Sequence, residues 1–245
     1  MTATGTKQAR SLAALQHKVV ACEACPRLVA YRRRIAKDKR RAYQEWTYWG
    51  RPVPSFGDPL ARLLIIGLAP GAHGANRTGR MFTGDSSGDF LYPVLHEAGF
   101  ASQPHSVDRA DGLRLIGCYI TAPVRCAPPD NKPSASEFQN CRPFLERELD
   151  LLKNVEVVVV LGRLALGAYL TVLQSRGQIE RISLYPFAHG VCHKLPAGRP
   201  LLVCSYHPSR QNTQTGRLTK SMFLKVFMQA RVLLDGAGAA RDSRH

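Results

Sequence analysis

The sequence predicts an α/β protein in which a mainly parallel, four-stranded sheet is covered by helices on both faces, plus a basic helical segment at the N-terminus. Four segments rich in Val, Ile and Leu lack the alternation of a half-exposed sheet, which is typical of parallel strands buried on both faces. They cover residues 63–68, 113–121, 155–161 and 200–206. Helix-like stretches follow them at residues 87–98, 134–152, 163–175 and 218–234. This alternation predicts a three-layer α/β/α architecture with right-handed crossovers.

The N-terminal segment, residues 11–58, differs in character from the rest of the chain. Residues 11–34 predict a helix interrupted by CEACP, and residues 27–41 hold eight basic residues and one acidic residue. A basic run of this kind is usually a solvated helix face. Here YQEWTYWG follows it and interleaves aromatic with polar residues, which is typical of a surface that meets a phosphate backbone.

The first strand breaks into GLAPG, the pattern of a buried strand that ends in a tight turn. Ligands of open α/β sheets bind where the carboxyl ends of strands open into such loops. The loop after GLAPG holds more chemically active side chains than a connection needs, namely His73, Asn76, Arg77, Arg80, Phe82 and Asp85. Asp85 also stands where the N-cap of the next helix is expected, before SSGDFL.

The second strand runs into an irregular, Pro-rich loop, TAPVRCAPPDNKP, from Thr121. Asn131 in this loop could bond a base edge or hold a water, although an Asn beside Pro is more often a turn residue. Ser134 then begins SASE, whose spacing is that of a capping box and predicts the start of a helix.

The last strand runs into HPSRQNTQTGR, from His207. If the strands are parallel, this loop opens at the same edge of the sheet as GLAPG. A single His after a strand is more often a cap than a catalyst. Here a Pro-Ser turn and a run of polar residues follow it, which suits a loop that binds a polar ligand.

Length and composition fit one large domain with a sizeable core, which we place at residues 1–235, followed by a flexible tail at residues 236–245. The 34 Lys and Arg against 18 Asp and Glu give a net charge of +16, and such an excess favours a polyanionic partner, above all nucleic acid. No apolar run is long enough to span a bilayer, and the N-terminus lacks an apolar signal core. We therefore expect a cytoplasmic monomer with no membrane partner.

Four of the seven cysteines suit a metal site. Cys22 and Cys25 form a C-x2-C pair, and Cys126 and Cys141 form a second, wider pair. Four thiolates suit a tetrahedral zinc ion or an iron–sulfur cluster about equally. A redox dithiol is a third interpretation, which is weaker because the close pair precedes no βαβ pattern.

These motifs together resemble the uracil-DNA glycosylase superfamily: the loop that begins at GLAPG, the four cysteines, the Pro-rich loop and HPSRQNTQTG. They are most similar to its fifth family, the bacterial and archaeal enzymes with an iron–sulfur cluster, and the resemblance covers about residues 22–234. It implies that Cys22, Cys25, Cys126 and Cys141 hold a structural [4Fe–4S] cluster near DNA. It also implies a DNA glycosylase that flips out a uracil or another deaminated base and removes it by hydrolysis, leaving an abasic site.

The resemblance also implies roles for single residues. Phe82 matches the position that stacks on the extruded base, and His207 would donate toward the base carbonyl as it gains negative charge. Residues that would frame the base are Gly67, Leu68, Ala69, Pro70, Gly71, Phe82 and Ala122. Residues expected to contact DNA are Arg77, Arg80, Ser209, Arg210, Gln211 and Asn212, with Arg77 and Arg80 equally well explained as donors that stabilise their own loop.

Two positions depart from the better-known pattern of these glycosylases. Leu68 stands where many relatives carry an acidic or polar residue that activates water, and Ala122 stands where the usual base-reading Asn is found. A pocket without polar discriminators rejects analogues poorly. We therefore expect substrates beyond uracil, such as hypoxanthine and also xanthine, with Asp85 and Asn131 supplying the missing catalytic functions.

Two other functions are weighed against this one. A non-enzymatic iron–sulfur or zinc module that binds nucleic acid would account for the charge and the cysteines, but not for Phe82, Asp85 and His207 at one sheet edge. A nucleotide-binding enzyme with GLAPG as its phosphate loop is disfavoured, because the segment lacks both G-x-G-x-x-G and the Lys-Ser/Thr of a P-loop.

Overall fold

One sheet lies at the centre of the chain, in the strand order β1-β3-β2-β4-β6-β5. The computed structural model describes residues 3–196 and 200–242. The strands are β1 Phe56–Gly57, β2 Leu63–Ile66, β3 Cys118–Thr121, β4 Val157–Leu161, β5 Cys192–His193 and β6 Leu201–Ser205. The four central strands are parallel, as predicted. The sheet has six strands rather than four, because β1 and β5 add short antiparallel edges that are too brief to leave a hydrophobic pattern.

Helices connect these strands and form the outer layers. The longer ones are α1 Ala3–Val20, α2 Pro26–Asp38, α4 Ser86–Glu97, α5 Ala135–Leu151, α6 Arg163–Ser175 and α8 Lys220–Asp242. Two single turns, α3 Ala75–Thr78 and α7 Arg210–Gln214, lie in the loops after β2 and β6. The helix α8 continues to Asp242, into the tail predicted for residues 236–245, of which residues 243–245 lie outside the described part.

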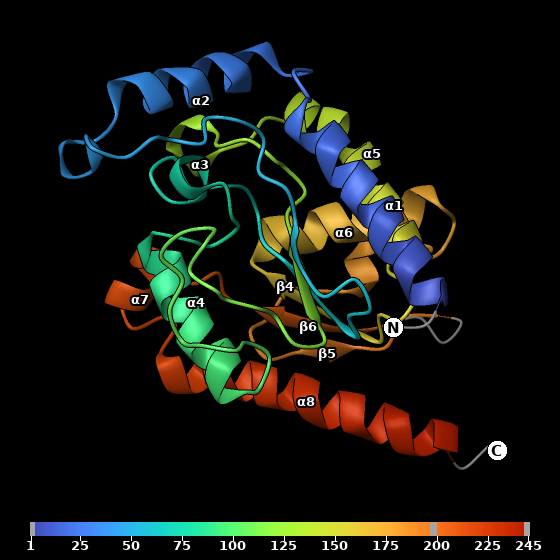
Figure 1. Cartoon of the computed structure of the whole chain (residues 1–245). Coiled ribbons are helices and arrows are strands. Elements are labelled where there is room, and N and C mark those ends of the chain that lie inside the picture. The colour runs from blue at the N-terminus through green and yellow to red at the C-terminus, as the bar shows by residue number, and fades with distance from the viewer. Residues whose placement is uncertain (1–2, 197–199, 243–245) are drawn as a thin grey trace.

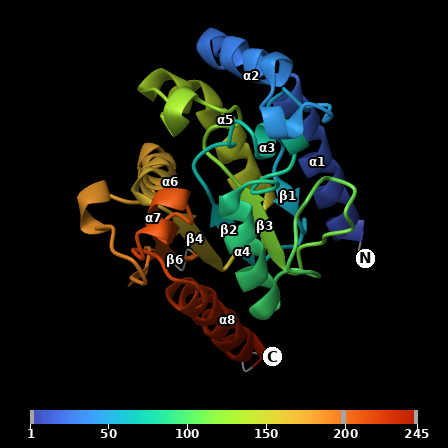
Figure 2. The ribbon, with the colours of Figure 1, turned by 90° about the vertical axis from the view of Figure 1, so that its left-hand side faces the viewer.

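The helices cover both faces of the sheet, which confirms the three-layer prediction (Figures 1 and 2). Leu63 and Ile65 of β2 face a core shared with α4 and α8. Leu64 and Ile66 face the opposite core, which is shared with α1 and α6. Every residue of β2 is buried, and for this reason the strand shows no polar alternation.

The predicted capping box is present at the start of α5. The Ser134 hydroxyl accepts from the Glu137 main-chain N–H, and the Glu137 carboxylate accepts from the Ser134 main-chain N–H at 2.8 Å. Arg27 of α2 donates to both carboxylate oxygens of Glu137 at 2.8 Å. The capping box therefore also fastens the N-terminal segment to the domain.

The predicted basic run lies on α2 and just beyond it, and some of its side chains form ion pairs within the protein or are buried. Arg27 pairs with Glu137, Arg33 pairs with Glu23, and Arg32 is buried. Among the described residues, the exposed members of the run that form no ion pair are Arg34, Lys37, Arg40 and Arg41. The exposed part of the run, and not the whole of it, is therefore free to face a polyanion.

A buried ion pair joins the loop after β3 to the helix α5. The guanidinium of Arg125, in the loop after β3, donates to the carboxylate of Glu148 on α5, and both side chains are almost fully buried. Thr121, the last residue of β3, donates to the same carboxylate at 2.6 Å, as does Ser55. Four side chains from three segments of the chain donate to this one carboxylate, because Gln16 of α1 also donates to it at 2.8 Å.

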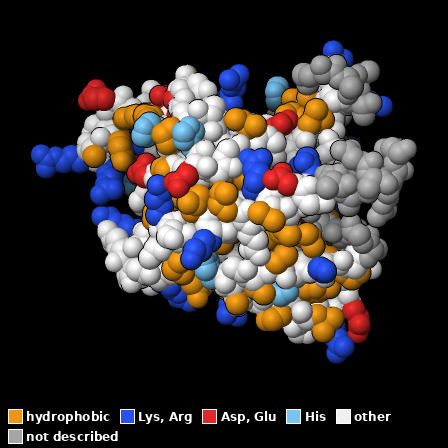
Figure 3. Space-filling model, turned by 90° about the horizontal axis from the view of Figure 1, so that it is seen from below, with side chains coloured by type: hydrophobic (Ala, Val, Ile, Leu, Met, Phe, Trp, Pro, Cys, Tyr) orange, Lys and Arg blue, Asp and Glu red, His pale blue; other side chains and the backbone are white. Residues whose placement is uncertain are grey.

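Seen from the side of α8, hydrophobic side chains gather between scattered Lys and Arg side chains (Figure 3). Met228 and Val232 of α8 are exposed. Over the described residues, none of the helices combines the length and the apolar character needed to cross a bilayer.

Replacement of Glu148 by Ala should destabilise the protein strongly, because it leaves the Arg125 charge buried without its partner. We expect a loss of about 3–5 kcal/mol in the free energy of unfolding, measured by urea denaturation. Asp150→Ala is the matched control: it lies on the same helix and pairs with Arg176, but at the surface, so its loss should stay below about 1 kcal/mol. Equal losses in the two variants would contradict this account of the pair.

Candidate active site

The register of the parallel strands brings three loops to one edge of the sheet. Ile66, near the end of β2, lies beside Thr121 of β3 and Val160 of β4. Leu161 lies beside Ser205 at the ends of β4 and β6. The loops that start after β2, β3 and β6 therefore open together, as the sequence predicts.

A cavity of about 560 Å³ lies at this edge. Every residue predicted to frame the base lines it, as do the predicted catalytic residues Asp85, Asn131 and His207. Tyr31 of α2, His73, Met81 and Pro128 also line the cavity. The sequence did not single out Tyr31, since only the packing of the N-terminal segment brings it to this edge.

Asp85 is both the N-cap of α4 and a wall of the cavity. Its Oδ1 accepts from the main-chain N–H groups of Ser87 and Gly88, at 3.0 and 3.1 Å. Its Oδ2 lies against Gly71 and Gly74, where a Cβ would stand 2.7 and 1.9 Å from it. Desolvation raises the pKa of Asp85 above its ordinary value, against the two hydrogen bonds, which lower it. The two roles weighed for Asp85, cap and site residue, are thus compatible: one oxygen caps the helix and the other faces Gly71 and Gly74.

Phe82 has a left-handed backbone, with φ of 52°, a conformation that is unfavourable for an aromatic residue. Its ring lies against Gly67, where a Cβ would come within 2.9 Å of two ring carbons. Its carbonyl lies against Gly88, where a Cβ would come within 1.8 Å. The absence of a Cβ at Gly67 and Gly88 therefore leaves the space that the ring and the carbonyl of Phe82 occupy.

His207 follows β6 and lies close to Phe82, with 5.9 Å between the ring centroids. Desolvation lowers the pKa of His207 to about 4, so the imidazole is neutral at pH 7. A neutral imidazole carries one N–H donor and one acceptor nitrogen. It can therefore donate a hydrogen bond to a ligand in this cavity without bringing a positive charge into it.

Asn131 lies at the exposed rim of the same cavity. Both Asp130 and Asn131 have left-handed backbones, with φ of 53° and 56°, within a single 3-10 turn, Pro129–Asn131. The turn interpretation of this Asn is therefore correct for its backbone, while its side chain remains available at the mouth of the cavity.

The four cysteines of the predicted metal site line a second, small pocket between α2, α5 and the loop after β3. Their neighbours there include Leu28, Phe144 and Arg125. Burial raises the pKa of Cys126 to about 12 and that of Cys141 to about 11. Over the part of the chain that is described, no group of three or more His, Cys, Asp or Glu side chains is placed so that it could hold a metal ion.

Comparison with known proteins places these features in a family. The family model of the uracil DNA glycosylase superfamily matches residues 54–231. A type-5 uracil-DNA glycosylase of Thermus thermophilus is 57% identical over 88% of this chain and 94% of its own length. Those of Mycobacterium bovis and Pyrobaculum aerophilum are 50% and 44% identical, over 92% and 87% of this chain and over 82% and 89% of their own lengths.

The chain belongs to the uracil-DNA glycosylase superfamily, and within it to the type-5 family. It is an enzyme, a DNA glycosylase that hydrolyses N-glycosyl bonds. The resemblance stated from the motifs is confirmed, and the non-enzymatic binding module is excluded.

Arg77 and Arg80 are engaged inside the protein, which corrects their assignment to DNA contact. Arg77 donates to the main-chain oxygens of His73 and Gly84, both at 2.8 Å. Arg80 donates to Thr83 at 3.0 Å and pairs with Asp111. Both side chains are buried. Of the two roles weighed for these arginines, the burial therefore favours donors that stabilise the loop over contacts to DNA.

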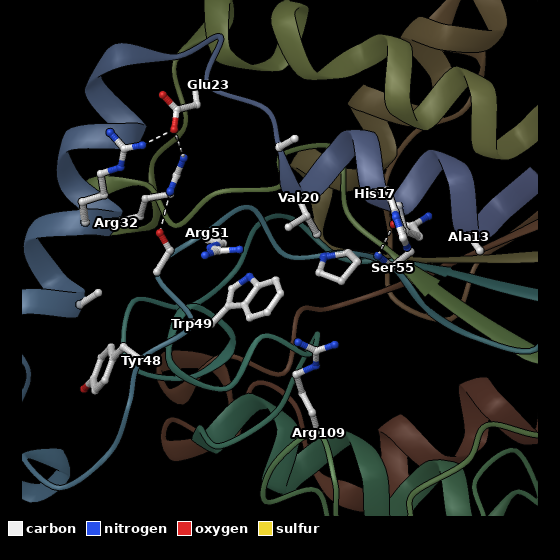
Figure 4. A pocket seen from close by; sticks show the side chains of 16 residues that line it. Ala13, His17, Val20, Glu23, Arg32, Tyr48, Trp49, Arg51, Ser55 and Arg109 are labelled. Carbon is white, nitrogen blue, oxygen red and sulfur yellow. Dashed lines mark hydrogen bonds and ion pairs between the residues drawn. The ribbon is translucent and has the colours of Figure 1, made fainter.

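The aromatic residues before β1 have structural contacts that the sequence did not reveal. Tyr43 and Trp46 pack on the Arg77 guanidinium, whose carbon lies 3.9 and 4.1 Å from the two ring centroids. Tyr48 is buried and bonds His73 at 3.1 Å. Trp49 lies between Arg51 and Arg109 in a groove beside α1 and α2 (Figure 4). Tyr48 is thus removed from the predicted phosphate-facing surface, while for the half-exposed Tyr43, Trp46 and Trp49 that surface stays a prediction.

The loop after His207 divides into exposed and engaged residues. Ser209 caps α7, and Arg210 and Gln211 are exposed at its start, with Ser209 and Arg210 on the cavity wall. Asn212 instead donates to the His207 carbonyl at 2.8 Å. Asn212 therefore shapes the His207 turn, and Arg210 and Gln211 are the members of the predicted set that can reach into a duplex.

A methyl group at Gly74 should disable the site, because its position lies 1.9 Å from the Asp85 carboxylate. We expect Gly74→Ala to lower single-turnover base excision by about 10²-fold, the scale of a displacement near 1 Å in an active site. Gly167→Ala is the control, since a Cβ there meets nothing within 4 Å. Undiminished excision by Gly74→Ala would show that the placement of Asp85 does not matter.

Proposed function

We propose that this enzyme removes uracil, and with it other deaminated bases such as hypoxanthine and xanthine, from DNA. The supporting observation is the composition of the cavity: an aromatic wall at Phe82, a carboxylate at Asp85 and a neutral His207 surround a space with no polar side chain at positions 68 and 122. The names of the relatives support uracil as one substrate. The broader range is supported by this chain's own residues.

The reaction requires the base to leave the duplex before its glycosidic bond can be reached. The extruded base would stack on the Phe82 ring, framed by the main chain of GLAPG. Its sugar would then lie toward Asp85, whose Oδ2 has no hydrogen-bond donor among the described residues. In this proposal the base end of the bond to be broken would meet an aromatic surface, and the sugar end would meet a carboxylate.

Cleavage develops positive charge on the sugar and negative charge on the departing base, and preorganised groups stabilise both. The Asp85 carboxylate would stabilise the sugar cation or orient the attacking water. Its ionised form is supported by its place at the N-terminus of α4, where the helix dipole favours an anion. His207 would donate a hydrogen bond to the base carbonyl, and Asn131 at the rim would hold a water or a base edge.

The proposed breadth of substrate follows from two apolar positions. Ala122 is 1% exposed and lines the cavity, and Leu68 lines it from the first loop. Neither side chain can form a hydrogen bond with the edge of one base, and neither has a polar group that a different base would leave unpaired. Discrimination against an analogue depends on such unpaired groups, so hypoxanthine should be accepted beside uracil.

We also propose that Cys22, Cys25, Cys126 and Cys141 hold a [4Fe–4S] cluster. The donor set supports this, because four thiols from three segments line one pocket with apolar neighbours, and thiolates are the ligands that such clusters use. The cluster would be a structural crosslink that ties the N-terminal segment to the Pro-rich loop. It would close the long loop between Cys25 and Cys126, which removes conformational entropy from the unfolded chain.

DNA is the proposed partner, bound by a monomer. The net charge of +16 supports a polyanion, and the exposed Arg210 and Gln211 beside the cavity are proposed to fill the gap left by the extruded base, with Ser209 at the start of their helix.

Replacement of Asp85 by Asn should lower single-turnover excision of uracil and hypoxanthine by about 10²-fold or more, since a positioned carboxylate contributes on this scale. DNA affinity, measured by fluorescence anisotropy, should change little. Asp89→Asn is the matched control, because Asp89 is an exposed carboxylate in the first turn of the same helix. If the two variants excise equally well, Asp85 has no part in the mechanism.

A further inference from the structure

Two buried arginines beside the cysteine pocket have a donor with no acceptor. Among the described residues, four buried side-chain polar atoms lack a hydrogen-bond partner, and two of them are the Nε atoms of Arg32 and Arg125. A buried, charged N–H group without a partner is unfavourable and is rare in native proteins. A bound group in the cysteine pocket that carries hydrogen-bond acceptors would give both Nε–H groups a partner.

Arg125 lines the cysteine pocket itself. Its two terminal nitrogens are occupied, one by Ser55 and one by Glu148. Its main-chain N–H lies beside the Cys141 thiol. The Nε is the one nitrogen of this guanidinium without a hydrogen-bond partner among the described residues, on a side chain that is 1% exposed.

Arg32 approaches the cysteines from α2. Its Nη1 donates to the Gly50 carbonyl at 2.6 Å (Figure 4). Its Nη2 donates to the Cys22 carbonyl at 3.5 Å. The guanidinium lies within hydrogen-bond reach of the Cys126 thiol. The nearest carboxylate, that of Glu23, is 4.0 Å away and is shared with the exposed Arg33.

We propose that Arg32 and Arg125 donate their Nε–H groups to the sulfur atoms of the bound cluster and balance its charge. This rests on the proposed [4Fe–4S] cluster. Four thiolate ligands give such a cluster a net negative charge, and buried charge requires an opposite charge or hydrogen bonds. Hydrogen bonds to the sulfurs and local charge also set the reduction potential of a cluster. The two arginines are thus positioning and tuning residues rather than ligands.

Arg32 also joins the cluster's surroundings to the active-site loop. The Asn76 side-chain amide, on α3, donates to the Arg32 carbonyl at 3.3 Å, and the Gly50 main-chain N–H donates to the Asn76 carbonyl at 3.0 Å. A cluster that fixes Arg32 therefore also fixes the turn that carries Gly74 to the cavity.

The test compares Arg32→Met with Arg33→Met in protein purified without oxygen. Both remove an arginine from adjacent positions of α2, but Arg33 is exposed and pairs only with Glu23. The readouts are iron per chain, the visible absorption band, the reduction potential and the rate at which a chelator removes iron. We expect Arg32→Met to lose iron about tenfold faster or more, the usual effect of removing a second-layer partner, and to have a more negative potential. Arg33→Met should match the wild type.

The outcomes separate this inference from the cluster proposal. Wild-type protein without iron would overturn the cluster and the inference together. Wild-type protein with iron, and equal potentials and iron loss in the two variants, would overturn the inference alone. If circular dichroism shows that Arg32→Met does not fold, Arg32→Lys decides: it keeps the charge but loses the Nε–H, so its potential must still differ from that of the wild type, and an unchanged potential overturns the inference.

Discussion

The buried ion pair between Arg125 and Glu148 fixes the short segment on which both sites of this glycosylase depend. Thr121 and Arg125 bond the Glu148 carboxylate, Ala122 lines the cavity, and Cys126 lines the cysteine pocket. A buried charge that loses its partner is strongly unfavourable, so this segment cannot shift without breaking the network. The position of the cavity wall and the position of a proposed cluster ligand are therefore set by the same carboxylate.

The close approach of side chains to glycine is the second constraint. Asp85 and Phe82 reach the cavity only because Gly67, Gly74 and Gly88 have no Cβ where an oxygen, a ring and a carbonyl lie. This explains why the loop after β2 is rich in glycine beyond the needs of a turn. The same packing desolvates Asp85 and raises its pKa, so the fold and the electrostatics of the site have one origin.

The sequence predicted what depends on local pattern and missed what depends on contacts between distant segments. The four parallel strands, the capping box of Ser134 and the convergence of Phe82, Asp85 and His207 follow from hydrophobic runs, capping residues and the rule for strand ends. The burial of Arg77 and Arg80 did not follow, because their partners include Tyr43, Trp46 and Asp111, which only folding brings near. The two edge strands are too short to leave a pattern.

The central claim is that an apolar pocket beside Asp85 and His207 accepts more than one deaminated base. The most direct measurement compares single-turnover rates of wild-type protein on matched duplexes that carry uracil, hypoxanthine or undamaged thymine at one position. The account predicts abasic sites from both uracil and hypoxanthine, with the thymine duplex measuring the background of undamaged DNA. Excision of uracil with hypoxanthine left intact would contradict it, because neither Leu68 nor Ala122 supplies a polar group that distinguishes the two bases.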